Sequence, residues 1–158
     1  MSAQSPPDPT VHVHVHVHGH CYCGAITFEV SIPAGASPIF TAYCHCDSCR
    51  RAHAAPLYHV ACVDTSMFRL TSGQDVLQEF TKPGGSIVRA FCGRCGSKVL
   101  NRFPGWTPGG REPVAFFPAL LDEATQHALP DALRPHKHNR PEESVLDHAM
   151  LQGFFDHD

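Results

Sequence analysis

The sequence predicts a single domain of mostly β structure, and three observations indicate this class. Short segments rich in β-branched and aromatic residues recur along the chain, bounded by Pro, Gly, Ser or closely spaced cysteines. The 158 residues include 14 prolines and 12 glycines, which suits many short strands joined by tight turns. No segment shows the strand–helix–strand pattern that a parallel α/β fold requires.

The first expected element covers residues 11–18, where valine alternates strictly with histidine. A period of two indicates a strand with the valines on one face and the histidines on the other, and His20 continues the histidine positions. Two interpretations of the histidine face stay open: an auxiliary metal site, or an edge strand with a solvated polar face, which we favour. Residues 1–10 are polar and Pro-rich and are expected to be a disordered tail, so the domain spans 11–158.

The other expected strands are short and lie between turn signals. Residues 71–74 (TSGQ) predict a turn, so 67–80 is expected to be a hairpin, and residues 82–85 (KPGG) predict a second turn. One short helix is expected at 122–129, with Asp122 as its N-cap. Residues 134–158 are expected to be an irregular segment that docks through Leu146, Met150, Leu151, Phe154 and Phe155. The strands are expected at residues 25–30, 39–44, 57–62, 68–70, 76–80, 87–91, 98–103 and 114–117.

Seven of the eight cysteines fall into three tight clusters, which are Cys21-Tyr22-Cys23, Cys44-His45-Cys46-Asp47-Ser48-Cys49 and Cys92-Gly93-Arg94-Cys95. Sulfurs one or two residues apart are poorly placed for disulfides with each other but can converge on one metal ion, usually zinc. Two pairs supply four thiolates, which close a tetrahedral site, whereas the triplet supplies three and leaves a position open for chemistry. The sequence therefore predicts one structural and one working metal ion.

Composition excludes some partners. A formal net charge of −3 gives no general electrostatic attraction for nucleic acid. No apolar run approaches the roughly 20 residues of a membrane span, and no apolar segment typical of a signal peptide follows the N-terminus. We therefore expect a cytoplasmic protein with a small-molecule substrate and no nucleic-acid or membrane partner, and a homo-oligomer is left open.

Three motifs, in order, resemble those of one known family. Residues 19–30 (GHCYCGAITFEV) are similar to its opening C-x-C-G motif, residues 44–51 (CHCDSCRR) to its C-H-C-x-x-C-[RQ]-[RK] motif, and residues 91–97 (FCGRCGS) to its F-C-x-x-C-G-[ST] motif. From about Gly19 to His138 the chain resembles the glutathione-dependent formaldehyde-activating enzyme family, which also contains the centromere protein V group.

The resemblance implies a Mss4-like β-tent of short antiparallel strands with zinc knuckles. In this family glutathione adds through its thiol to formaldehyde, and the reverse reaction is carbon–sulfur lyase chemistry. The resemblance thus implies a zinc-dependent lyase that acts on an adduct of glutathione or of another thiol. It implies two zinc ions per chain, a structural one at Cys21, Cys23, Cys92 and Cys95 and a catalytic one at Cys44, Cys46 and Cys49.

The chemistry of three thiolates is consistent with that activity. Zinc bound by three thiolates carries one formal negative charge, so it is better suited to binding a substrate thiol than to polarising a poor electrophile. The competing interpretation is a non-catalytic zinc-binding interaction module, which the open position of the triplet disfavours. A zinc-buffering protein that uses the Val-His repeat is a weaker third.

Several neighbouring residues keep two interpretations each. Arg50 and Arg51 are candidate substrate-binding residues, since arginine pairs with carboxylates, but one of them could instead brace the cysteine loop. His45 either donates a hydrogen bond behind the metal or points outward. Cys62 is expected to be a buried free thiol rather than a ligand.

Two departures from the family pattern stand out. The family usually has a glycine near the position of Ala54 or Ala55, so the local turn is expected to differ. Residues 136–143 lack the aromatic-rich tail of the formaldehyde-related members, which leaves open whether the thiol is glutathione.

Overall fold

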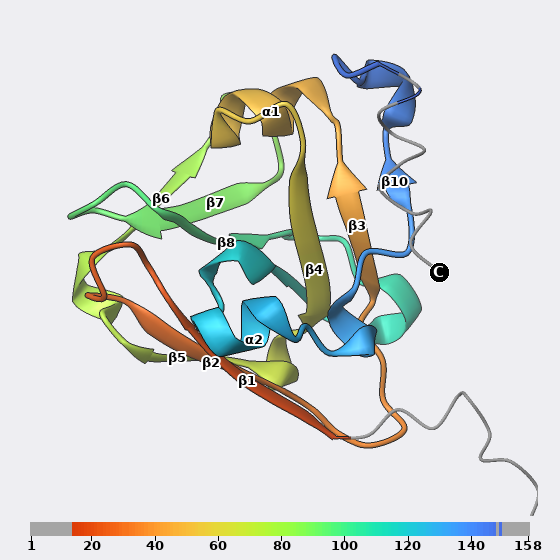
Figure 1. Ribbon diagram of the computed structural model, residues 1–158. Helices are drawn as coiled ribbons and strands as arrows, with labels where there is room; N and C mark the ends of the chain where they lie inside the picture. Colours follow the sequence, from red (N-terminus) through yellow and green to blue (C-terminus); the bar gives the residue numbers. More distant parts are fainter. Residues whose placement is uncertain (1–13, 148, 150–158) are drawn as a thin grey trace, which may run out of the picture.

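Two sheets, both mainly antiparallel, form the framework of the computed structural model, which describes residues 14–147 and 149 (Figure 1). The smaller sheet has the order β1-β2-β5. The larger sheet has the order β10-β3-β4-β9-β8-β7-β6. All pairings are antiparallel except that of β10 with β3. The mostly β prediction is therefore confirmed.

Apart from β10, which was not expected, the strand bounds agree with the expected segments to within a few residues; residues 11–13 of the first expected strand lie outside the described residues. The smaller sheet comprises β1 (Val15–His20), β2 (Thr27–Ile32) and β5 (Phe68–Ser72). The larger sheet comprises β3 (Phe40–Cys44), β4 (Tyr58–Asp64), β6 (Leu77–Thr81), β7 (Val88–Cys92), β8 (Lys98–Arg102), β9 (Pro113–Phe116) and β10 (His138–Asn139).

Two helices are present in the described residues. The helix expected at 122–129 is α2 (Glu123–His127); Asp122 occupies the N-cap position, but its side chain makes no capping hydrogen bond. The other helix, α1 (Asp47–His53), follows β3 and precedes β4, and was not expected. Figure 1 shows α1 at the end of these two strands that is remote from the smaller sheet. None of the helices within 14–147 and 149 has the length and apolar character that spanning a bilayer requires.

The core lies between the two sheets because each sheet buries an apolar face there. In β1 the valines are buried and the histidines exposed, as the alternation predicted, and β1 is an edge strand. Phe28 and Phe116 meet across the sheets with ring centroids 6.1 Å apart. A second apolar cluster covers the other face of β4 and β9 and includes Cys44 and Cys49. Burial on both faces fixes β4 and β9, and β3, which carries Cys44, is hydrogen-bonded to β4.

The hairpin expected over 67–80 is wrong. β5 pairs with β2 in the smaller sheet, whereas β6 pairs with β7 in the larger one. The chain changes sheets at Gly73, whose φ of 79° places it in the left-handed region. By contrast, the KPGG turn does join two paired strands, β6 and β7.

The C-terminal segment is irregular apart from β10 and a short 3₁₀ turn at Pro141–Glu143. Leu146 is partly buried. Met150, Leu151, Phe154, Phe155 and the expected tail at 1–10 lie outside the described residues.

Candidate metal centre and adjoining cavity

Four thiols from distant parts of the chain converge at one point. The sulfur atoms of Cys21, Cys23, Cys92 and Cys95 all lie within 4.8 Å of one another. The Sγ atom of Cys23 is 3.6 Å from that of Cys21 and 3.8 Å from that of Cys92. These four residues are called the four-thiol cluster below. The cluster joins the end of β1 to the β7–β8 turn, and its donor set suits a metal ion.

Two backbone knuckles of the same design present these thiols. In the first, the Cys21 amide donates to the Ile26 carbonyl and the Gly24 amide to the Cys21 carbonyl. In the second, the Cys92 amide donates to the Ser97 carbonyl and the Gly96 amide to the Cys92 carbonyl. Both glycines have positive φ values, 74° and 79°, which an L-residue adopts only at a cost. The local sequence thus builds each half of the cluster independently.

Hydrogen bonds favour the thiolate at two of the sulfurs, whereas, against a hydrogen bond from the Ala25 backbone, burial and the neighbouring thiols raise the pKa of Cys23 to about 11. The Ile26 amide donates to Cys21 Sγ at 3.3 Å. Hydrogen bonds from the Ser97 hydroxyl and amide lower the pKa of Cys95 to about 5. Because a thiolate is the form that binds a metal, these contacts prepare the cluster for an ion.

The second group, Cys44, Cys46 and Cys49, is called the thiol triplet. Cys44 is the last residue of β3, Cys46 is the N-cap of α1, and Cys49 lies in the first turn of α1. Cys44 and Cys49 are buried, and Cys46 is partly exposed. All eight cysteines are free thiols, as expected for metal ligands rather than disulfides.

The triplet is less compact than the four-thiol cluster. Cys49 hydrogen-bonds both Cys44 and Cys46. The three sulfurs are nevertheless not among the groups of described residues whose ligand atoms all lie within 4.8 Å. The thiol of Cys46 is engaged locally, by hydrogen bonds from the backbone of Cys49 and Ser48 and by the Cys49 side chain.

Three residues that the sequence did not single out donate to the triplet. Asn139 Nδ2 donates to Cys44 Sγ at 3.5 Å, and Arg89 Nη2 donates to Cys49 Sγ at 3.7 Å. The Tyr58 hydroxyl hydrogen-bonds both Cys44 and Cys49. Asn139 arrives through the parallel pairing of β10 with β3, which places it opposite Cys44. The contacts come from β4, β7 and β10, so spacing along the sequence gave no signal for them.

These contacts shift the pKa values of the two buried thiols, Cys44 and Cys49, in opposite directions. The hydrogen bond from Cys49, helped by those from the Cys46 backbone and Asn139, lowers the pKa of Cys44 to about 6 against the effect of burial. The Cys44–Cys49 hydrogen bond and burial raise the pKa of Cys49. These contacts therefore favour the thiolate at Cys44 and the protonated thiol at Cys49.

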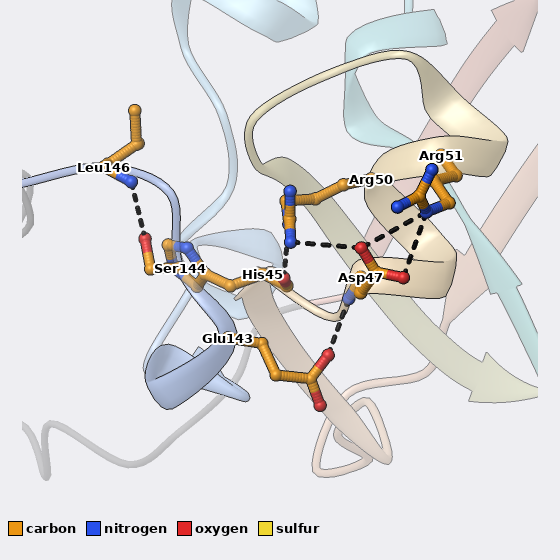
Figure 2. Close-up of polar contacts among 7 residues, drawn as sticks. All are labelled: His45, Asp47, Arg50, Arg51, Glu143, Ser144 and Leu146. Carbon is orange, nitrogen blue, oxygen red and sulfur yellow. Dashed lines mark hydrogen bonds and ion pairs between the residues drawn. The ribbon is translucent and has the colours of Figure 1, made fainter.

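The two arginines after the triplet lie differently (Figure 2). Arg50 is mostly buried; its Nε donates to the His45 carbonyl at 2.9 Å and its Nη2 to Asp47 at 3.4 Å. Arg51 is exposed and pairs with Asp47 at 3.1 Å. The Asp47 amide donates to Glu143, so the C-terminal segment also holds the start of α1. Arg50 thus holds the segment that carries the cysteines in place, whereas Arg51 faces solvent beside a cavity.

His45 does not point outward: it is fully buried, and its Nε2 lies 2.7 Å from Nδ1 of His138. Cys62 is buried in β4 and belongs to no group of described residues suited to a metal, as expected; burial raises its pKa to about 12. Ala54 ends α1 with a φ of 50°, in the left-handed region. The chain thus makes with alanine a turn that glycine would adopt at lower cost.

A cavity of about 520 Å³ opens beside α1. Four cationic side chains line it together with two phenylalanines and a single carboxylate. One of the cations, Arg89, also contacts the triplet. A larger cavity, about 670 Å³, contains no cysteine and is lined in part by Trp106. The lining residues of the smaller cavity are Asp47, Ser48, Arg51, Ala52, Phe80, Lys82, Arg89, Phe91 and Lys98.

The sequence of the whole β region matches a known family. A profile described as glutathione-dependent formaldehyde-activating enzyme covers residues 16–139. The chain belongs to this family. Its fold is similar to a crystal structure of a Rhodobacter sphaeroides protein, a structural genomics target, with a TM-score of 0.55. The two share 21% identity over 77% of this chain and 99% of that chain, which shows the fold alone. No curated protein matches the chain in sequence.

Proposed function

We propose that this protein is a zinc-dependent enzyme of the carbon–sulfur lyase type that acts on a small thiol adduct at the thiol triplet. The observation that carries the proposal is the position of Arg89. One of its terminal nitrogens donates to Cys49 Sγ at 3.7 Å, and the same side chain lines the cationic cavity. Arg89 therefore links the triplet to the cavity, although no cysteine is among the residues that line the cavity.

The four-thiol cluster fits a structural zinc ion. Zinc–sulfur bonds of about 2.3 Å in a tetrahedron place neighbouring sulfurs about 3.8 Å apart. The separations of 3.6 and 3.8 Å from Cys23 to its two neighbours lie close to that value. Four thiolates leave no open position, so this ion would stabilise the fold rather than react.

The thiol triplet would hold the second zinc ion. Its donors match zinc, and Cys46 would complete the set by exchanging its hydrogen bonds with the backbone of Cys49 and Ser48 for the ion. When bound there, zinc would supply an open position that binds a thiol and lowers its pKa. Asn139 and Arg89 would keep their hydrogen bonds to the sulfurs and so hold Cys44 and Cys49 in place.

The cavity favours an anionic substrate. Arg51, Lys82, Arg89 and Lys98 outnumber the one acid, Asp47, which is paired with Arg50 and Arg51. Nη1 of Arg89 is buried and has no hydrogen-bond partner among the described residues, so it can receive a carboxylate. A thiol that carries carboxylates, such as glutathione, fits this chemistry. The eight free thiols support a reducing, cytoplasmic setting.

The reaction needs no oxidant or reductant. In the direction of cleavage, the carbon–sulfur bond of a hydroxymethyl thioether breaks and its electron pair goes to sulfur. The hydroxyl group loses its proton as the carbon–oxygen double bond forms, and the sulfur gains a proton. The cavity cations would orient the substrate carboxylates, while the triplet receives the sulfur.

The first experiment replaces Cys46 with Ser and measures cleavage of hydroxymethyl thioethers at saturating zinc. The variant should stay folded, because Cys46 is outside the four-thiol cluster, and should lose at least about tenfold in activity, the size of effect seen when groups around a metal are removed. Cys62→Ser is the control for loss of a thiol. Full activity of Cys46→Ser would contradict the proposal and favour a non-catalytic interaction module.

The second experiment tests the cavity with a matched pair of lysines. Lys98 Nζ lies 4.7 Å from the ring centre of Phe91, and Lys137 Nζ lies 5.2 Å from that of Phe40, outside this cavity. Lys98→Met should raise KM for a carboxylate-bearing thiol adduct several-fold and leave KM for an uncharged adduct unchanged. Lys137→Met should change neither. The same change in KM for both adducts in Lys98→Met, or no change for either, would show that the cavity does not discriminate substrates by charge.

A further inference from the structure

The histidine face of β1 has a feature that the sequence alone did not show. Besides the four-thiol cluster, the described part of the chain holds a second group with metal-ligand geometry, His16, His18 and Glu29, whose ligand atoms all lie within 4.8 Å of one another. The histidines alternate on β1, and Glu29 lies on β2 directly opposite His18. Opposed residues of antiparallel strands share a face, so the carboxylate joins the imidazoles.

We propose that His16, His18 and Glu29 form a surface site for a borderline divalent transition-metal ion such as Zn²⁺ or Ni²⁺. His16 Nε2 lies 3.7 Å from Glu29 Oε2, and the rings of His16 and His18 have centroids 4.8 Å apart. In a tetrahedral site with bonds of about 2.1 Å, ligand atoms are about 3.4 Å apart. The exposed imidazoles can close the remaining gap by small rotations.

The carboxylate of Glu29 is divided between two tasks. Its Oε1 accepts from Arg69 Nε at 2.9 Å and from Arg69 Nη2 at 2.8 Å. Its Oε2 faces His16 and remains for an ion. Arg69 is opposite Glu29 on β5, so the central strand of the sheet carries the carboxylate between an arginine and a histidine.

The ring nitrogens of the neighbouring histidines bond elsewhere, although the His14 ring stacks against that of His16 with centroids 6.2 Å apart. His14 Nε2 lies 2.9 Å from the Ser31 hydroxyl, and His20 Nδ1 lies 2.9 Å from the Cys21 carbonyl. Val15 and Val17, on the opposite face of β1, are each only 5% exposed and hold the strand on the core. The backbone that presents His16 and His18 is therefore fixed, which favours a defined site over a loose histidine tract.

The donor set selects the class of ion. Two imidazole nitrogens and one carboxylate suit Zn²⁺, Ni²⁺ and Cu²⁺, whereas Mg²⁺ and Ca²⁺ prefer oxygen donors. With three protein ligands the site leaves positions for water. It is distinct from the four-thiol cluster and the thiol triplet, and it does not depend on the proposed lyase function.

The test titrates Ni²⁺ by calorimetry into tag-free, full-length protein that carries two equivalents of zinc, which fill the two thiol sites and leave the histidine face free. One Ni²⁺ ion per chain should bind at the site. Glu29→Gln, His16→Ala and His18→Ala should each weaken this binding by about tenfold or more, by analogy with the loss of groups around other metal sites. His127→Ala is the matched control, because His127 and Glu123 also lie 3.7 Å apart at the surface without a second histidine; it should leave the affinity unchanged.

Two further variants test alternatives to a three-residue site. Arg69→Met tests whether the role of Glu29 is only structural, and His14→Ala tests whether the ion binds along the whole histidine repeat. Arg69→Met removes the ion pair of Glu29 but keeps its carboxylate, so Ni²⁺ binding should be as tight as in the unaltered protein or tighter. If Arg69→Met weakens binding as much as Glu29→Gln, the effect of Glu29 is structural and the proposal fails. It also fails if His14→Ala weakens binding as strongly as His16→Ala, since the ion would then be held by the repeat as a whole.

Discussion

Replacing Cys92 with Ser should destabilise the zinc-loaded protein far more than the same replacement at Cys62. Both thiols are completely buried in strands of the larger sheet, β7 and β4. Both changes leave a hydroxyl group in an apolar setting, which costs about 1–3 kcal/mol when the group is unsatisfied. Only Cys92 belongs to the four-thiol cluster. The difference between the two variants therefore isolates the contribution of the bound ion.

The magnitude follows from the length of chain that the cluster closes. Cys23 and Cys92 are 69 residues apart in sequence. A cross-link of that span removes about 4 kcal/mol of chain entropy from the unfolded state, by the relation used for disulfides. Because domains of this kind are stable by about 5–15 kcal/mol in total, Cys92→Ser should lose a large fraction of its stability.

The assay is urea unfolding of both variants and the unaltered protein, with and without a strong chelator. Chelation should lower the free energy of unfolding of the unaltered protein and of Cys62→Ser by more than that of Cys92→Ser, which retains only the ion of the thiol triplet. If Cys92→Ser is no less stable than Cys62→Ser, and the chelator has no effect on the unaltered protein, the four-thiol cluster does not hold a structural ion.

Two further predictions concern the fold and its pH dependence. A Cβ atom at Gly73 would meet the Ala25 carbonyl oxygen and lie 2.8 Å from Ile26 Cα, whereas one at Gly84 would have no atom within 4 Å. Both glycines have positive φ, so Gly84→Ala should cost about 1–2 kcal/mol and Gly73→Ala about 3 kcal/mol or more in the free energy of unfolding; equal losses would refute the packing argument. Burial lowers the pKa of His59 to about 4, below its ordinary value of 6.5, so the unfolded chain binds an extra proton between these pH values and stability is lost as pH falls through that window. The slope of unfolding free energy against pH is proportional to the number of protons taken up on unfolding. Near pH 5, His59→Phe should therefore reduce this slope by the amount that corresponds to about one proton. An unchanged slope would mean that His59 is not held neutral.

Local sequence determined the strands and the two cysteine knuckles. The order of apolar and polar residues in a strand reflects which of its faces is buried. In β1 the alternation of valine and histidine is evident from neighbouring residues alone. The knuckles are equally local, because Gly24 and Gly96 supply the left-handed conformation that each turn requires. The sequence also placed the three cysteine clusters in separate groups, and the four-thiol cluster assembles from the two pairs that spacing selected.

A missed helix and a wrong hairpin show where local signals were weaker. Asp47 in the first turn of α1 and Arg50 and Arg51 in its last turn are charges that favour a helix of that direction, and this signal could have revealed it. The hairpin expected over 67–80 had a correct turn at Gly73, but strand pairing depends on partners remote in sequence. β5 finds β2 and β6 finds β7, a choice that the turn residues do not determine.

Only the tertiary structure decided what surrounds the thiol triplet and the histidine face. Asn139, Arg89 and Tyr58 reach the triplet from β10, β7 and β4, and their residue types carry no local sign of this role. Glu29 likewise joins His16 and His18 only through the register of β1 against β2. Register and sheet order depend on how the apolar faces of the whole chain pack together. Short-range spacing can therefore predict which groups are potential ligands, but not which side chains meet around them.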